Sequence, residues 1–312
     1  MTKNSRSSSP GHDPIQPIMA SPGNSGPAVS SPAPATGPEI IRPAHPLKAG
    51  RFRGFIRPQY RDALLLEALA CPQRLLQSEG AEVLREGRNR VVVVKTAFST
   101  GEKKELVIKE FSSHGINKLK TLVEPSKAAK AWRGAMALVE RTIETPAPVA
   151  FLERKKRGFV EECYFLAERT IGFDEIRGCF LNHRSGELEA LLPALARYLA
   201  ACHEAGILHR DLSDGNILLR KNTAGDYVFT LLDTNRIRVY KRLSTPRRVK
   251  NLIRLGIPKP QQRYFLEQYF GGFGLSPLSW LWYRLNKDVF GVYIGLKKIL
   301  CLKKLARKLR IQ

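Results

Sequence analysis

Hydrophobic and polar positions along the chain predict a region rich in short strands followed by a region of longer helices. Residues 59–76 carry apolar side chains at helical spacing, which predicts one amphipathic helix. The chain then changes to short apolar runs between turn residues, a pattern typical of an antiparallel meander. The strands of this meander are expected at 81–85, 91–95 and 106–111.

A helix and two further strands complete the first region. Ser126, directly after Pro125, has the residue type of a helix N-cap, so a helix is expected from there to residue 140. Strands are expected at 149–153 and 163–168, on either side of a basic turn. The order of three strands, a helix and two strands is that of the small lobe of a protein kinase.

The second region begins with a strong helix at 187–204, whose apolar residues form one stripe and which Gly206 is expected to end. Beyond Asp233 the pattern is mainly helical. The predicted fold class is therefore α+β: a two-lobed protein-kinase-like fold with an antiparallel-sheet N-lobe and a mainly helical C-lobe. The leading helix and N-lobe are expected at 51–168, and the C-lobe with a basic C-terminal helix at 169–312.

Composition changes this picture at the N-terminus. Residues 1–50 hold ten of the 20 prolines together with many Ser and Gly, so they cannot offset the entropy of ordering by burial. A disordered Pro/Ser-rich tail is expected there. The N-terminus lacks the apolar core of a secretory signal, and no stretch reaches the roughly 18 apolar residues that a spanning helix needs. The sequence therefore favours a soluble or peripheral protein.

Charge and cysteines limit the partners and the compartment. The formal net charge of +24 predicts anionic partners such as phosphates, acidic membranes or nucleic acid. No nucleic-acid motif is present and aromatic residues do not alternate with the basic ones, so a specific nucleic-acid partner is not expected. The five cysteines form no paired C-x-x-C arrangement, and they fit a reducing cytoplasm.

One motif carries specific chemistry. His209, Arg210, Asp211 and Asn216 match the kinase catalytic-loop pattern H-R-D-x-x-x-x-N, between an amphipathic helix and an apolar strand. Asp211 is the expected catalytic residue, which orients an acceptor hydroxyl and takes its proton. Asn216 and Asp233 offer the oxygen ligands that Mg²⁺ accepts, and they are the expected metal ligands. The alternative is a helix-ending turn followed by polar loop residues.

The expected nucleotide contacts are less strongly marked. Lys109 lies in the third strand, where a kinase places its phosphate-binding lysine. Arg88 lies in a glycine-poor turn that could cover the phosphates of ATP or be an ordinary hairpin turn, and Glu168 ends the strand before the expected hinge. The glutamate that usually pairs with the lysine is harder to place: Ala131 occupies the middle of the helix, and Glu124 before it is the candidate.

The chain resembles the bacterial lipopolysaccharide core kinases over roughly residues 80–270. The resemblance rests on the segments 205–212 and 216–219, and on Asp233-Thr234-Asn235-Arg236, where protein kinases have Asp-Phe-Gly. It implies an ATP- and Mg²⁺-dependent kinase that phosphorylates Kdo or heptose of the inner core, with Asp211 as base, Asn216 and Asp233 on magnesium, and Lys109 on the nucleotide. Thr234 departs from the larger apolar residue that is common in the family.

Two basic stretches fit such an acceptor. Residues 235–263 contain ten Lys or Arg and no acid, which favours either binding of a lipopolysaccharide core or other anionic sugar, or a solvated helix face. Residues 291–312 are also basic without an acid, and their apolar stripe shifts near Cys301. They suggest attachment to an anionic membrane surface, at the cytoplasmic face of the inner membrane. Docking of this segment on the large lobe is the competing interpretation.

Other functions remain open at this point. One is a kinase of the same fold that acts on protein or on another small molecule. Another is a pseudokinase that serves as a membrane-associated binding module, as suggested by the glycine-poor turn, Ala131 and Thr234. The choice between Kdo and heptose, and the oligomeric state, are not determined by the sequence.

Overall fold

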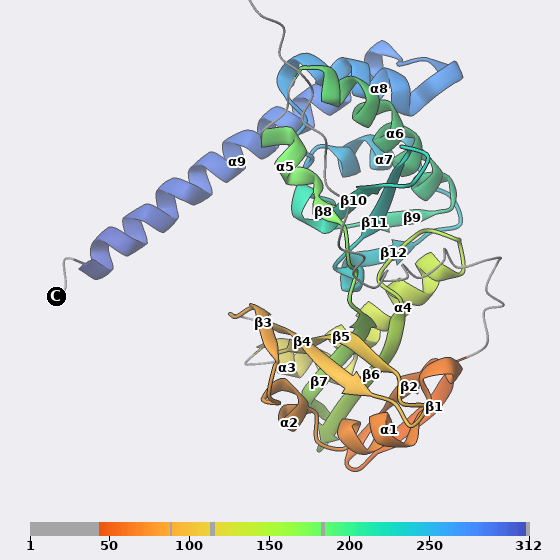
Figure 1. The fold of residues 1–312 in the computed structure, drawn as a ribbon. Coiled ribbons are helices and arrows are strands. Elements are labelled where there is room, and N and C mark those ends of the chain that lie inside the picture. Colours follow the sequence, from red (N-terminus) through yellow and green to blue (C-terminus); the bar gives the residue numbers. More distant parts are fainter. Residues whose placement is uncertain (1–43, 88, 113–115, 182–184, 310–312) are drawn as a thin grey trace, which may run out of the picture. The chain divides into compact units, whose positions relative to one another are not determined.

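The computed structural model describes residues 44–87, 89–112, 116–181 and 185–309 (Figure 1). It confirms the α+β fold class, with an antiparallel sheet in the N-terminal lobe and mainly helices in the C-terminal lobe. The expected Pro/Ser-rich tail lies outside the described residues up to position 43. Separate hydrophobic clusters fill the two lobes, and residues of α4 (Lys127–Val139) belong to clusters in both.

The N-lobe, as described, is built on a seven-stranded sheet in which neighbouring strands are antiparallel. Its strand order is β1-β2-β6-β7-β5-β4-β3. The predicted meander and the later strand pair are confirmed; β3 is one residue shorter than expected and the other four strands are longer. The strands are β1 (His45–Ala49), β2 (Phe52–Ile56), β3 (Glu82–Arg85), β4 (Asn89–Ala97), β5 (Lys103–Phe111), β6 (Pro148–Lys156) and β7 (Phe159–Glu168).

The sheet begins earlier than the predicted boundary at residue 50. β1 pairs with β2 in a hairpin, and it buries Leu47 and Ala49 while Pro46 and Lys48 face solvent. This alternation is short and contains Pro46, which hid it among the many prolines of the tail. Because β1 lies at the edge of the sheet, a proline is tolerated there. The expected division between tail and lobe is therefore wrong by several residues.

The single helix expected at 59–76 is also wrong. The segment contains a 3₁₀ turn, η1 (Pro58–Tyr60), and two short helices, α1 (Ala63–Leu69) and α2 (Pro72–Leu76). Asp62 caps α1 by accepting from the backbone N–H of Leu64 at 3.0 Å. Pro72 has no N–H to continue that helix and begins the next one. The apolar spacing was correct, but the proline divided it.

Helices cover both faces of the sheet. On one face, α1 and α2 bury Leu65, Leu69 and Leu76 against the strands. On the other face lies α4, whose Trp132 packs against Phe151 with ring centroids 5.9 Å apart. α4 begins at the predicted Ser126 cap, whose hydroxyl accepts from the N–H of Ala129 at 2.9 Å. The remaining N-lobe elements are α3 (Ile116–Leu119) and η2 (Lys120–Leu122).

The C-lobe is built around α6 (Ser185–Glu204), the strong helix that the sequence predicted. Its apolar stripe lies in a buried cluster with side chains of the surrounding helices and hairpins. Gly206 ends it in a left-handed conformation, φ 75°, and a Cβ at this position would overlap the carbonyl oxygen of Tyr240. The other elements are β8 (Asp174–Glu175), α5 (Ile176–Leu181), β9 (Ile207–His209), η3 (Asp214–Asn216), β10 (Ile217–Lys221), β11 (Tyr227–Leu231), η4 (Thr234–Arg236), β12 (Ile237–Val239), α7 (Thr245–Leu252), η5 (Lys259–Gln261), α8 (Gln262–Phe270), η6 (Gly271–Phe273) and α9 (Pro277–Leu309).

The last helix, α9, is longer than the sequence pattern indicated. It begins at Pro277, packs Tyr283 into the C-lobe cluster, and then extends away from the rest of the lobe (Figure 1). Within the described part of the chain, no helix combines the length and the apolar character that crossing a membrane requires.

Candidate active site

The catalytic loop is fixed by the buried imidazole of His209. The carbonyl oxygen of Leu232 lies 2.8 Å from Nε2, and the backbone N–H of Asp211 donates to Nδ1 at 3.2 Å. Because a carbonyl only accepts and an N–H only donates, the ring is neutral with its hydrogen on Nε2. Burial lowers the pKa of His209, which agrees with this state. The ring therefore ties the loop to the strand end that precedes Asp233.

Asn216 connects the same two segments. Its side-chain Nδ2 donates to the backbone carbonyl oxygen of Asp211 at 2.7 Å. Its backbone carbonyl oxygen accepts from the N–H of Leu232 at 2.9 Å. Since the amide nitrogen is used to hold the loop, the amide oxygen is left to bind a ligand. Among the predicted residues, Asp211, Asn216 and Asp233 are thus held by backbone hydrogen bonds within one small region.

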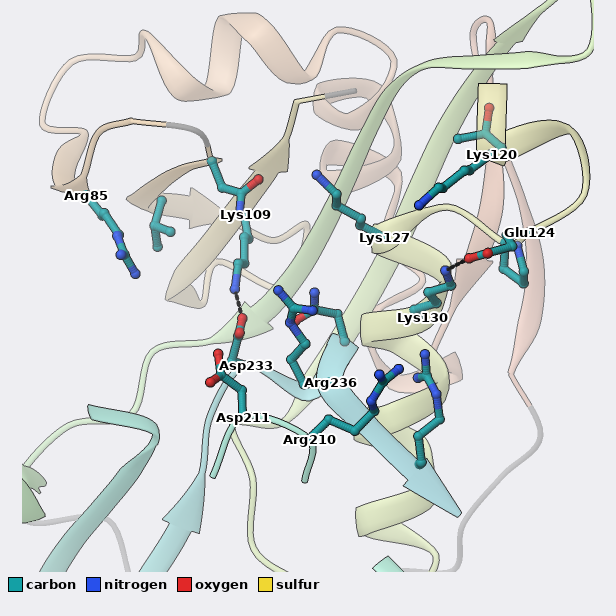
Figure 2. Close-up of a pocket in the computed structure, with 16 residues that line it drawn as sticks. Arg85, Lys109, Lys120, Glu124, Lys127, Lys130, Arg210, Asp211, Asp233 and Arg236 are labelled. Carbon is teal, nitrogen blue, oxygen red and sulfur yellow. Dashed lines mark hydrogen bonds and ion pairs between the residues drawn. The ribbon is translucent and has the colours of Figure 1, made fainter. Parts of the chain in front are cut away.

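Asp233 adopts a left-handed backbone conformation, φ 54°, which costs a non-glycine residue about 1–3 kcal/mol. Its carboxylate forms an ion pair with the ammonium group of Lys109, from the opposite lobe (Figure 2). The amide nitrogen of Asn235, in the orientation that satisfies its surroundings, donates to Asp233 Oδ1 at 3.0 Å. The structure therefore brings the predicted nucleotide lysine and the predicted metal ligand into direct contact.

The two unusual positions in the sequence, Ala131 and Thr234, contact each other. The Thr234 hydroxyl donates to the carbonyl oxygen of Ala131 at 2.8 Å, in a buried environment. One turn further along α4, Gly134 lies so close to the backbone of Thr234 that a Cβ there would overlap its carbonyl oxygen. α4 therefore packs its backbone directly onto η4, and it positions the residue before η4, Asp233, by contact instead of by a charged side chain.

A pocket of about 570 Å³ opens between these segments and the N-lobe (Figure 2). Of the described residues that line it, eight are Lys or Arg and three are Asp or Glu, so the pocket is suited to anionic ligands. The lining residues are Arg85, Asn89, Val91, Lys109, Lys120, Thr121, Glu124, Pro125, Lys127, Lys130, Arg210, Asp211, Asp233, Asn235, Arg236 and Arg238.

For three other residues that the sequence suggested, the structure does not show the expected contact. Arg88 is outside the described residues, although its neighbour Asn89 lines the pocket. Glu168 lies at the end of β7, with its carboxylate 3.2 Å from Lys104 Nζ, and does not line the pocket. Glu124 pairs with Lys130 at 2.5 Å, so it is not the partner of Lys109 in this structure.

Arg254 is the residue whose position the sequence did not reveal. Its guanidinium pairs with the carboxylate of Asp211 and lies over the ring of Phe290 in α9, 5.3 Å from the centroid. On either side of Arg254, the carbonyl oxygens of Ile253 and Leu255 accept from Lys287 Nζ at 2.8 and 2.5 Å. The only signal in the sequence was membership of the acid-free basic stretch at 235–263.

The available donors fit a magnesium ion. Within the described part of the chain, no group of three or more His, Cys, Asp or Glu is arranged to hold a metal. Asp233 and Asn216 instead supply one charged and one neutral oxygen from adjacent segments. A hard octahedral cation that keeps waters and phosphate oxygens needs no more than one or two protein ligands of this kind.

Fold and site together define the chain as a phosphotransferase with a protein-kinase-like fold. A family model for the lipopolysaccharide kinase (Kdo/WaaP) family matches residues 74–264, more than half of the sequence. The chain therefore belongs to this family, whose members transfer phosphate to a sugar hydroxyl. The resemblance found in the sequence is thereby confirmed.

The similarity to individual proteins is weaker than the match to the family model. A solved structure titled "WaaP in complex with acyl carrier protein" is similar to the chain, with 21% sequence identity and a TM-score of 0.46. The similar region covers 64% of this chain and 81% of that chain. None of the curated proteins matches significantly.

Proposed function

We propose that the chain phosphorylates a Kdo or heptose sugar of the lipopolysaccharide inner core, with ATP as the phosphoryl donor and Mg²⁺ bound to it. The observation that carries this proposal is the contact between Lys109 and Asp233 across a basic pocket that also contains Asp211. A nucleotide lysine, a metal ligand and a base are then within one site, in a chain of the lipopolysaccharide kinase family.

Asp211 is the proposed catalytic base. Its backbone is fixed by the bonds to His209 and Asn216, and its carboxylate lines the pocket. There it would orient the acceptor hydroxyl toward the γ-phosphoryl group and take its proton during transfer. Arg254 would hold the carboxylate in place before the acceptor binds.

Lys109, Asn216 and Asp233 are proposed to bind the nucleotide. In the structure, Lys109 and Asp233 form an ion pair in which their charges neutralise each other. With nucleotide bound, the lysine would contact phosphate oxygens, while Asp233 and the Asn216 amide oxygen would hold the metal. When bound, Mg²⁺ supplies positive charge that stabilises the phosphate oxygens as the bond to the leaving group breaks.

The basic residues around the pocket support an anionic acceptor. Arg236 and Arg238, from the acid-free stretch, line the pocket beside Lys120 and Lys130 of the N-lobe. These cations are more than one nucleoside triphosphate requires, and Kdo is itself an acidic sugar. We place the reaction at the cytoplasmic face of the inner membrane, where ATP and a lipid-linked core acceptor are both accessible.

The test is phosphate transfer from ATP and Mg²⁺ to purified lipopolysaccharide core acceptors, compared between the wild type and Asp211→Ala. Loss of a general base typically lowers the rate about 10²- to 10⁴-fold, so transfer should collapse in this variant. A matched control is Asp226→Ala, which removes an exposed carboxylate in the turn between β10 and β11 and should transfer at the wild-type rate.

The product identifies the substrate, because mapping the new phosphate distinguishes Kdo from heptose. Transfer to a peptide instead of a core sugar would move the proposal to another acceptor class. Binding of ATP without transfer to any acceptor would contradict the kinase activity and favour a nucleotide-binding module without catalysis.

A further inference from the structure

Helix α9 presents an apolar stripe to solvent from its first turn to residue 300. Between residues 278 and 300 the exposed large apolar side chains recur three or four positions apart, and Leu278, Val289 and Val292 are 78%, 69% and 64% exposed. At 100° per residue, the ten side chains of this outer stripe fall within an arc of about 120°. The outer stripe consists of Leu278, Leu281, Trp282, Leu285, Val289, Val292, Tyr293, Leu296, Ile299 and Leu300.

The other side of α9 is already occupied by the C-lobe. Tyr283 is fully buried, and Trp280 and Phe290 pack against the same cluster. Lys287 donates to two backbone carbonyls of the segment after α7, and this fixes the rotation of the helix about its own axis. Apart from Trp282, whose indole N–H donates to the carbonyl oxygen of Pro246 at 3.1 Å, the outer stripe is therefore directed away from the lobe. From Gly291 onward nearly every described side chain is exposed.

Charge identifies the kind of surface that would cover this stripe. Asp288 is the sole acid in the sequence of α9, while the sequence from Lys297 to Arg310 contains seven Lys or Arg and no acid. Pairing of this helix with a second copy would bring these like charges together. An anionic surface would instead attract them, and each basic residue near the lipid headgroups would add to the attraction.

We propose that the outer stripe of α9 docks the protein on an anionic lipid bilayer, with the helix lying in the interface and its apolar side chains among the headgroups and first acyl carbons. An apolar stripe with Trp and Tyr, followed by a basic segment, is the composition of interfacial helices. This inference deepens the proposed location at a membrane and rests on it.

The test measures vesicle binding without nucleotide or acceptor, so its failure and a failure of the proposed kinase activity remain distinguishable. Full-length protein is titrated with vesicles of phosphatidylcholine alone or with about one third phosphatidylglycerol. The stripe variant is Val292→Gln with Leu296→Gln. The control variant, Gly291→Gln with Gly295→Gln, moves the same two glutamines back by one residue to exposed positions outside the stripe, where a Cβ has open space. Neither changes the net charge.

Binding to the anionic vesicles is expected for the wild type and the control, and it should weaken as salt is raised. The stripe variant should bind about tenfold more weakly or worse, because two apolar side chains no longer leave water. Equal binding by both variants, or no binding by the wild type, would overturn the proposal. A concentration-dependent dimer that only the stripe variant loses would instead assign the stripe to a second copy of the chain.

Discussion

The two walls of the active-site pocket are built in different ways. The C-lobe wall contributes Asp211 and Asp233, which line the pocket, and the adjacent Asn216; part-buried hydrogen bonds hold this region to neighbouring backbone. The N-lobe wall, formed by Arg85, Lys109, Lys120, Lys127 and Lys130, consists of long side chains that remain partly or fully accessible. The proposed reacting groups thus lie where hydrogen bonds fix the backbone, and the cations of the N-lobe lie on side chains that can adjust; Arg236 and Arg238 add cations from the C-lobe side.

The largest difference in activity is expected between substitutions of two lysines in the N-lobe wall, Lys109 and Lys130. Lys109→Met removes the charge that contacts Asp233, and it should lower kcat/KM about 10²- to 10³-fold, as for loss of one charge-stabilising group in a closed site. Lys130 is engaged by Glu124 outside the metal-binding region, so Lys130→Met should cost about tenfold or less. Steady-state transfer kinetics of the two variants measure the difference. Equal losses would show that the wall acts only through its total charge.

The packing between α4 and η4 offers a structural test of the C-lobe wall. Gly134→Ala forces α4 away from the carbonyl oxygen of Thr234, and it should lower the free energy of unfolding by about 3 kcal/mol. Gly178→Ala places the same methyl group in open space on helix α5 and should be neutral or slightly stabilising. Denaturant titration of both variants gives the comparison. A Gly134→Ala protein as stable as the wild type would show that this contact does not position Asp233.

Acid pH should destabilise the support beneath the C-lobe wall. Burial lowers the pKa of His203 to about 4; this ring accepts from the Tyr269 hydroxyl at 2.7 Å and donates to Asn251, whose amide donates in turn to the carbonyl of His209. Since the unfolded imidazole binds a proton near pH 6.5, His203 contributes no pH dependence above that value. Below it, stability should fall, by about 2 kcal/mol at pH 5.

Unfolding free energies between pH 7 and pH 5 measure this effect, and His203→Gln should remove that part of the slope. An unchanged slope in the variant would assign the acid sensitivity to other groups, such as the buried His209.

Arg254 should have a smaller effect on activity than Lys109, because it positions a residue that other bonds already hold. Arg254→Met removes the ion pair to Asp211 and should lower kcat about tenfold, with little change in KM for ATP. Arg263→Met removes a cation from the same basic stretch, where it pairs with Glu267 on the exposed face of α8. This control should keep full activity. A rise in acceptor KM with unchanged kcat would show that Arg254 binds the acceptor instead of holding the base.

The predictions from the sequence were correct mainly where the pattern that carries them is local along the chain. Most N-lobe strands, α4 with its Ser126 cap and α6 were predicted because their patterns are local. The leading helix failed because Pro72 divides a correct apolar spacing, and β1 was missed because a short edge strand containing Pro46 resembles the tail around it. The family and the phosphotransferase class were correct because the catalytic loop is contiguous.

The chemistry of the site was determined by the sequence itself. The spacing from His209 to Asn216 and the segment around Asp233 specified the expected base and metal ligands, since these groups lie within one loop and one strand end. Only the tertiary structure decided which distant groups they meet. Lys109 pairs with Asp233, Arg254 with Asp211, and Ala131 with Thr234, and each contact joins residues that are 43 or more positions apart. Such contacts depend on how helices and lobes pack, and packing has no local signature in the chain.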